Sequence, residues 1–215
     1  DTPTPTFTPS PTPLASPTLT PKPTRKAEQP DSFEISGLGG QNQAYPLNCE
    51  ARSAVDWAAF FGVSIGEMEF QDALPVSDNP EEGYVGSYRD PSGYIPPNSY
   101  GVHAAPVARV LRAYGVKAEE RKGMSIAELK AEIAAGRPVI VWIINASYPG
   151  SPVEYTAKDG SKVRVAYFEH TVIAYGYTAN SIILRDGMYR KEMTTDAFRE
   201  NWAVLGNMAV TAREK

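Results

Sequence analysis

Apolar residues recur at helical spacing soon after residue 48. Between residues 48 and 61, Ala51, Val55 and Ala58 fall on one face of a helix, and Gly62 stands where that helix would end. Polar residues occupy intervening positions. The pattern predicts a helix over 48–61 whose apolar face packs against a core.

Two further helices are indicated by their end signals. Pro106 suits a first helical turn, and the apolar residues after it predict a helix that runs through Tyr114. Ser125 and Glu128 have the spacing of a capping box, and Gly136 would end the helix that they start.

Beyond residue 138 the pattern changes to short runs of branched and alternating apolar residues, which are typical of β-strands. The predicted strands cover residues 138–144, 162–167, 171–177, 181–184 and 208–211, with one short helix at 195–202. Helices grouped in front of an antiparallel sheet predict an α+β domain.

The segment between residues 75 and 101 is rich in turn-forming residues and tyrosines, which predicts one long loop. Long loops in compact domains often carry function. We expect Tyr84 and Tyr100, together with Trp142 of a predicted strand, to line part of a substrate groove. The alternative is that these aromatic side chains cover the edge of the core.

Composition divides the chain into two parts. Residues 1–32 consist largely of Thr, Pro and Ser with almost no large apolar side chains, so they predict an extended, disordered spacer. Residues 33–215 are expected to form one domain. Because such spacers usually face the outside of a cell, we expect an extracellular or cell-envelope location, with any signal peptide or anchor lying outside this sequence.

Charge and hydropathy exclude several kinds of partner. No run approaches the roughly 20 apolar residues of a membrane-spanning helix. With a net charge of −4 and no basic cluster, the chain is not expected to bind nucleic acid. We assign no residue to a cofactor or a metal.

The chain has a single cysteine, Cys49, at the predicted start of the 48–61 helix. It cannot form an internal disulfide, which leaves an intermolecular bridge, an inert buried thiol or a reactive one. The free N–H groups and the positive end of the helix dipole favour a thiolate at this position. Cys49 is therefore a candidate nucleophile.

A catalytic thiol also needs a base, a group that orients the base, and donors to an oxyanion. Of the two histidines, His170 lies between predicted strands and is preferred as the base over His103, which precedes a helix. Asp186, at the end of a predicted strand, can orient the base, with Asn180 as the rival. Gln43, six residues before the cysteine, can supply another group. Each residue alone has an ordinary structural explanation, but their order along the chain indicates catalysis.

Five segments follow one another in an order that matches a known family. They are residues 47–51 (Leu-Asn-Cys-Glu-Ala) preceded by Gln43, 78–86, 100–106, 136–142, and 170–172 followed by Gly176, Tyr177 and Asp186. Together they resemble the papain-like clan of cysteine peptidases, and within it the stand-alone relatives of the bacteriocin-processing peptidases that cut double-glycine leaders. The resemblance covers most of residues 43–211.

The resemblance implies a papain-like fold in which N-terminal helices pack on a C-terminal antiparallel sheet. It also implies four roles: Cys49 as nucleophile, His170 as base and then acid, Asp186 as the acceptor that orients the imidazole, and Gln43 as a donor to the oxyanion. His103 does not fall on a catalytic position of the family pattern. The family often has proline after the aspartate, where this chain has Gly187.

We therefore expect a secreted or cell-surface bacterial cysteine peptidase that acts on peptide or protein substrates. A thiolate–imidazolium pair of Cys49 and His170 is the expected resting form, because each charge favours the other. Two other functions remain open. One is a thiol acyltransferase on the same scaffold, and the other is a non-catalytic surface module that is held out on the spacer to bind a partner.

Overall fold

The computed structural model describes residues 29–144 and 150–213. The predicted spacer, residues 1–32, therefore lies almost entirely outside the described residues. Among the described residues, no helix combines the length and the apolar character that crossing a membrane requires.

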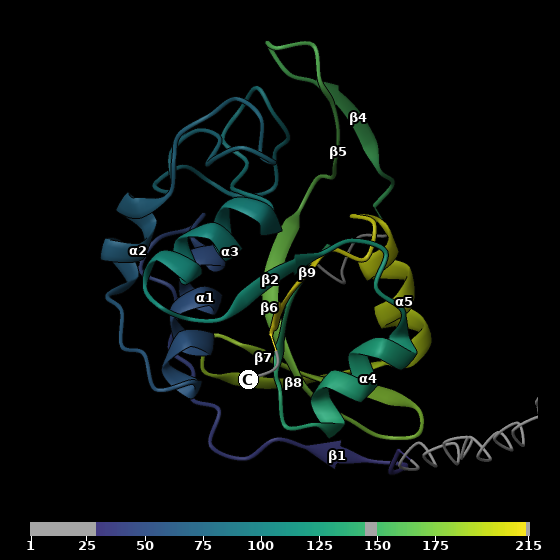
Figure 1. Ribbon diagram of the computed structural model, residues 1–215. Helices are drawn as coiled ribbons and strands as arrows, with labels where there is room; N and C mark the ends of the chain where they lie inside the picture. The colour runs from purple at the N-terminus through teal and green to yellow at the C-terminus, as the bar shows by residue number, and fades with distance from the viewer. Residues whose placement is uncertain (1–28, 145–149, 214–215) are drawn as a thin grey trace, which may run out of the picture.

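A seven-stranded antiparallel sheet forms the centre of the described domain (Figure 1). Its strands are β1 (Phe33–Glu34), β2 (Ala118–Arg121), β3 (Val139–Ile144), β6 (Glu169–Tyr177), β7 (Ser181–Asp186), β8 (Tyr189–Thr194) and β9 (Ala209–Ala212). Six strands lie in the order β2-β9-β3-β6-β7-β8, and β1 pairs with the end of β6. A separate hairpin of β4 (Val153–Thr156) and β5 (Lys162–Val165) projects from one end of the domain (Figure 1).

Helices cover both faces of this sheet. They are α1 (Cys49–Phe60), α2 (Glu67–Ala73), α3 (Ala104–Ala113), α4 (Ile126–Ala134) and α5 (Thr195–Ala203). The first three lie on one side of the sheet, and α4 and α5 lie on the other (Figure 1). The predicted α+β class is confirmed.

The helices predicted from spacing and end signals are present within two residues of their expected ends. The capping box at the start of α4 has formed: Glu128 N–H donates to Ser125 Oγ at 3.2 Å, and Ser125 N–H donates to Glu128 Oε2 at 2.8 Å. In α3 the helix begins at Ala104, so Pro106 lies in its first turn, where proline costs no backbone hydrogen bond.

Five elements of the domain were not predicted, namely α2, β1, β2, β4 and β8, and each has few buried apolar residues. In α2 only Phe70 and Gln71 are buried, and the helix is held by an ion pair between Glu67 and Arg52 of α1 at 3.0 Å. β2 and β8 lie at the two ends of the sheet order, and β8 is almost wholly exposed. Edge strands carry polar residues on exposed surface, so hydrophobic periodicity does not find them.

The contact between α1 and β6 fixes the geometry of the whole site. Ala51, Ala54 and Ala58 of α1 are completely buried, and their small side chains allow the helix to lie close to the sheet. Ser53 Oγ donates to the carbonyl of Thr171 at 3.0 Å, which joins the two elements directly. The first residue of α1 is thereby held beside the start of β6.

The buried imidazole of His103 joins the long loop to the start of α3. His103, the residue before α3, is completely buried; its Nδ1 lies 2.9 Å from Glu81 Oε1 and its Nε2 lies 3.1 Å from the Tyr100 hydroxyl. Because Nδ1 faces a carboxylate, it is the nitrogen that carries the proton. Lys122 also pairs with Glu81, at 2.7 Å. Burial opposes ionisation of this carboxyl, but His103 and Lys122 outweigh it and lower the pKa of Glu81 to about 2.

This network predicts acid-sensitive stability. Because the pKa of Glu81 is lower in the folded chain than its ordinary value of 4.5, its contribution is fully present above pH 4.5 and is lost as the pH falls toward about 2. Glu81→Gln should lower the free energy of unfolding by about 2 kcal/mol at neutral pH and flatten its decline between pH 5 and pH 3. Thermal unfolding of the wild type and the variant across that pH range measures both effects. Glu82→Gln is the control, because Glu82 is exposed. A Glu81→Gln curve parallel to that of the wild type would show that the network does not govern acid stability.

Candidate active site

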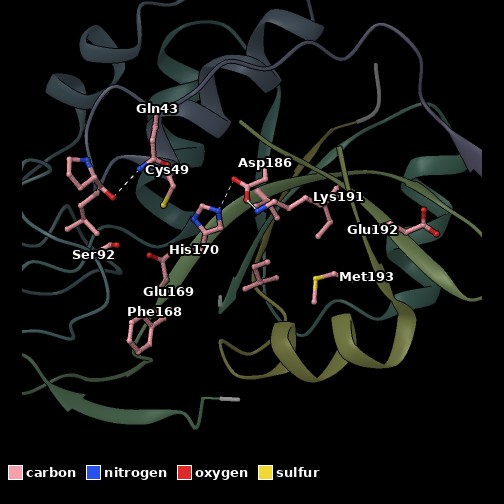
Figure 2. A pocket seen from close by; sticks show the side chains of 15 residues that line it. Gln43, Cys49, Ser92, Phe168, Glu169, His170, Asp186, Lys191, Glu192 and Met193 are labelled. Carbon is pink, nitrogen blue, oxygen red and sulfur yellow. Dashed lines mark hydrogen bonds and ion pairs between the residues drawn. The ribbon is translucent and has the colours of Figure 1, made fainter. Parts of the chain in front are cut away.

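A pocket of about 490 Å³ opens between the start of α1 and the strands β6, β7 and β8. Cys49, His170, Asp186 and Gln43 all lie in its wall (Figure 2). Apolar side chains complete much of the lining, namely Leu47, Ile143, Phe168, Val172, Leu184 and Met193. The four residues singled out in the sequence are thus brought to one place.

Cys49 is the first residue of α1, as the sequence pattern predicts. The preceding Asn48 does not cap the helix: its Oδ1 accepts the N–H of Tyr45 at 3.1 Å, and its Nδ2 donates to Glu67 Oε1 at 2.7 Å. Among the described residues, no side chain caps the start of α1. The first helical bond runs from Arg52 N–H to the Asn48 carbonyl at 3.0 Å, so the N–H of Cys49 has no helical carbonyl to which it can donate.

The imidazole of His170 lies between the thiol and a carboxylate (Figure 2). His170 Nε2 is 2.9 Å from Asp186 Oδ1, so this nitrogen is engaged and the other ring nitrogen is left for the thiol side. Asp186 Oδ2 in turn accepts from Lys191 Nζ of β8 at 2.5 Å. Burial alone would raise the pKa of Asp186, but His170 and Lys191 outweigh it and hold that pKa well below its usual range.

The turn after Asp186 explains why glycine occupies this position. Gly187 has φ +55°, which proline cannot adopt because its ring holds φ near −65°. The turn is also covered closely by the segment before the nucleophile: a Cβ at Gly40 would collide with the Gly187 carbonyl oxygen, and one at Gly187 would lie 3.1 Å from Asn42 Oδ1. These two glycines let the strand that ends in Asp186 approach the loop that contains Gln43.

The side chain of Gln43 is committed to its own loop. Its Nε2 donates to the carbonyl oxygens of Tyr45 at 2.7 Å and Pro46 at 3.1 Å. Figure 2 shows the amide beside Cys49 at the mouth of the pocket. The residue is therefore in place, but both of its amide hydrogens are used by backbone acceptors.

The expected thiolate does not fit the surroundings of Cys49. The thiol is buried, which raises its pKa well above the usual value, and the neighbouring carboxyls of Glu50 and Glu169 raise it further. The backbone of Thr171 acts in the opposite direction but is outweighed. The thiol also faces Glu50 Oε2 at 3.4 Å, as a donor. The expectation of a resting thiolate–imidazolium pair is corrected: the structure favours a protonated thiol.

Glu50 and Glu169 were not predicted as site residues. In the sequence, Glu50 resembles an ordinary acidic residue in a first helical turn, and Glu169 is one polar residue at a strand start. Their only signal was that each is adjacent to a candidate catalytic residue. Donor atoms of Cys49 and these two carboxyls lie within 4.8 Å of one another. Three of the four carboxyl oxygens already accept hydrogen bonds from protein groups, so we assign no metal to the cluster.

The predicted groove aromatics are not in the pocket wall. Tyr84, Tyr100 and Trp142 are at most 3% exposed. Their polar atoms serve the interior: the Tyr84 hydroxyl donates to the Leu47 carbonyl, and Trp142 Nε1 donates to the Val102 carbonyl at 2.9 Å. The predicted place of these side chains is corrected, because a buried ring that joins the loop to the core cannot contact a substrate in the pocket.

The rivals considered in the sequence lie away from the pocket. Asn180 is exposed in the turn between β6 and β7, at the opposite end of β7 from Asp186. His103 is enclosed by Glu81 and Tyr100, as described above. Geometry therefore separates His170 and Asp186 from both alternatives.

The fold and this arrangement define a papain-like cysteine peptidase scaffold. Residues 39–210 match the model of the Peptidase C39 like family. Because the match covers most of the chain, the protein belongs to this family, in agreement with the resemblance seen in its motifs.

The chain is also similar to individual proteins and solved structures. The chain is 26% identical over 144 residues to the uncharacterized protein YvpB of Bacillus subtilis, covering 65% of this chain and 54% of that protein, so it spans about half the length of this relative. A C39-like peptidase structure from Bacillus anthracis superposes with a TM-score of 0.74 at 24% identity over 86% of this chain and 99% of that one. Xylellain, from Xylella fastidiosa, gives a TM-score of 0.51 at 13% identity over 88% of each chain. Both structures show the shared fold.

Proposed function

We propose that this chain is a cysteine peptidase that hydrolyses peptide bonds with Cys49 as nucleophile, His170 as base and then acid, and Asp186 as the group that orients His170. One observation carries the proposal. The buried thiol at the start of α1 shares a pocket with an imidazole whose far nitrogen is bonded to a carboxylate at 2.9 Å. Membership of a peptidase family supports it, and xylellain, which shares the fold, is itself a cysteine protease.

The protonated thiol determines the first chemical step. As the sulfur attacks the substrate carbonyl carbon, the thiol proton passes to the free nitrogen of His170, and the carbonyl oxygen becomes an oxyanion. Asp186 holds the ring in the tautomer that can accept this proton and stabilises the imidazolium that forms. Transfer of the proton during attack avoids a free thiolate in a site whose burial and carboxyls oppose it.

The remaining steps return every group to its starting state. The tetrahedral intermediate collapses, the carbon–nitrogen bond breaks, and His170 gives its proton to the leaving amine. Water then attacks the thioester while His170 accepts its proton. Collapse of the second intermediate releases the acid and restores the Cys49 thiol.

Two donors are proposed for the oxyanion. One is the backbone N–H of Cys49, which lies in the open first turn of α1. The other is Gln43, whose amide turns from one of its two carbonyl partners toward the substrate oxygen. The longer bond, to the Pro46 carbonyl at 3.1 Å, is the one to be exchanged.

Peptide or protein chains are the proposed substrates, and the proposed location is outside the cell or in its envelope. Away from the proposed catalytic groups, the pocket lining combines apolar side chains with the polar side chains of Ser92, Lys191 and Glu192, which suits an unfolded peptide that has both kinds of group. The location rests on the Thr/Pro-rich composition of residues 1–32.

The peptidase activity is tested by incubating the protein with a peptide library and identifying products by mass spectrometry, with Cys49→Ala alongside. Cleavage by the wild type alone supports the proposal. An added amine nucleophile distinguishes hydrolysis from acyl transfer: free carboxyl products indicate a peptidase, whereas amide products at the same bond indicate an acyltransferase. A library left intact by the wild type would contradict both enzymatic functions.

Asp186 and Asn180 can be compared directly as the orienting residue. Asp186→Ala should lower kcat by roughly 100- to 10,000-fold, because the imidazole loses the acceptor that fixes its tautomer. Asn180→Ala should retain kcat, since Asn180 is exposed at the other end of β7. Steady-state kinetics on one cleaved peptide decides between them. If Asn180→Ala loses the activity and Asp186→Ala keeps it, the orienting role is misassigned.

A further inference from the structure

Two carboxyl groups are buried together directly behind the Cys49 thiol. Glu50, the second residue of α1, is completely buried, and Glu169, the first residue of β6, is 6% exposed. Glu50 does not line the pocket, whereas Glu169 does. The peptidase mechanism described above uses neither carboxyl, so their burial next to the thiol needs its own explanation.

The chain makes a specific space for this pair. Gly101 has φ +117° and stands beside both carboxyls: a Cβ there would collide with Glu50 Oε1 and would lie 3.5 Å from Glu169 Oε2. The next residue, Val102, donates its N–H to Glu50 Oε1 at 2.7 Å. A backbone that only glycine readily adopts thus places a donor on one carboxyl and leaves room for the other.

Of the four carboxyl oxygens of Glu50 and Glu169, one has no hydrogen-bond partner among the described residues. Glu50 Oε2 accepts from the Cys49 thiol at 3.4 Å, and Glu169 Oε1 accepts from the Thr171 hydroxyl at 3.1 Å. Glu169 Oε2 is fully buried and has no hydrogen-bond partner among the described residues. A buried carboxylate oxygen without a donor is costly, and a proton carried by one of the two carboxyls would remove one of the two buried charges.

Electrostatics point the same way. No Lys or Arg among the described residues forms an ion pair with Glu50 or Glu169. Burial raises the pKa of both carboxyls, and the charge of Glu50 raises the pKa of Glu169 further, although hydrogen bonds to Glu50 act in the opposite direction on its own pKa. Two close carboxylates in a low-dielectric site do not both ionise at neutral pH.

We propose that Glu50 and Glu169 share one proton and act as a positioning pair for Cys49, which holds the thiol through Glu50 Oε2 and opposes its ionisation until His170 accepts the thiol proton. The pair then carries a single negative charge next to the sulfur. It keeps the resting thiol protonated and aimed, and it makes proton transfer to His170 part of the attack on substrate.

Every element packed against the pair contributes groups that face it. From α1 and β6 these are Cys49, His170 and the Thr171 hydroxyl, and from the long loop they are the hydroxyls of Tyr84 and Tyr100. Burial raises the pKa of both tyrosines, and the carboxyls raise it further, so neither phenol ionises in the neutral range. Cys49 is therefore the group whose protonation responds to the pair.

The test measures the thiol pKa of Cys49 by the pH dependence of iodoacetamide alkylation in the full chain. Glu50→Gln replaces the charged acceptor of the thiol by a neutral amide and leaves Glu169 buried without a charged neighbour, so the thiol pKa should fall by at least about one unit. Glu169→Gln confines the charge to Glu50, and the thiol pKa should stay the same or rise. Exposed Glu200 of α5 supplies the control, because Glu200→Gln should change nothing. An unchanged thiol pKa in Glu50→Gln, or an equal fall in both pair variants, overturns the proposal.

A measurement on the wild type keeps the proposal testable if a variant does not fold. Infrared spectroscopy at neutral pH should show a protonated carboxyl band that shifts when the glutamates are labelled with ¹³C, since these are the two buried glutamates among the described residues. The double variant Glu50→Gln/Glu169→Gln should lack the band if it folds. A wild type without the band overturns the proposal. The role of the pair during attack on substrate rests on the proposed function, but neither measurement requires peptidase activity, so failure of this inference can be distinguished from failure of the proposed function.

Discussion

Cys49→Ala is expected to abolish peptide hydrolysis, lowering kcat by about 10⁵- to 10⁶-fold to the background of the assay. Loss of the sulfur removes the atom that forms the thioester, and Cys49 is the single cysteine of the chain. Gln43→Ala should be milder, at about 100-fold, because the backbone donor of the first helical turn remains.

The measurement compares kcat for the two variants and the wild type on one peptide that the wild type cleaves. Thermal unfolding should confirm that both variants fold, because alanine is a good helix former at the first position of α1. Equal rates for Cys49→Ala and the wild type would exclude the covalent mechanism. A Gln43→Ala variant as inactive as Cys49→Ala would show that the backbone N–H contributes little to the oxyanion.

The grouping of the proposed catalytic residues was predictable because these residues occupy simple positions. Cys49 begins a helix whose apolar period is regular, and His170 and Asp186 lie on successive strands, β6 and β7, as the strand pattern indicated. Helix starts and strand ends can be located from local signals. The residues that these elements bring to one pocket were therefore within reach of the sequence alone.

The protonation state of the site was not predictable in the same way. The start of a helix favours a thiolate, but the buried carboxyls of Glu50 and Glu169 oppose it, and their effect depends on a tertiary contact between α1 and β6. The Lys191 bond to Asp186 likewise depends on the pairing of β7 with the unpredicted edge strand β8. Sequence periodicity locates elements, whereas burial and charge pairing arise only when distant elements meet.

For the long loop between residues 75 and 101, the sequence predicted binding residues that the structure instead places in the interior. Tyrosines among turn residues suggested a groove, because exposed aromatic side chains often bind ligands. In the structure Tyr100 packs with Val85, Val163 and Val165 in a small second core beneath the β4–β5 hairpin. Local composition could not distinguish these cases, since the hairpin that buries the ring comes some 60 residues later in the chain.

The two histidines should separate activity from stability. His170→Ala should lower kcat by about 10⁴- to 10⁶-fold and leave thermal unfolding nearly unchanged, because its side chain is 26% exposed at the pocket. His103→Ala should retain the chemistry but lower the free energy of unfolding by roughly 2–3 kcal/mol, since it leaves Glu81 and the Tyr100 hydroxyl without a buried partner.

The contrast is measured with the same two assays on both variants. In His170→Ala the thiol should still react with iodoacetamide at alkaline pH, which shows that the nucleophile is intact and that only the proton acceptor is missing. In His103→Ala the kcat of the folded fraction should match the wild type once the temperature is kept below the new unfolding transition. If a folded His103→Ala variant is inactive and a His170→Ala variant is active, then His103 is the base and His170 is the structural histidine. That outcome would require the base to reach Cys49 from a buried position already enclosed by Glu81 and Tyr100, which the packing of α3 against the loop does not allow.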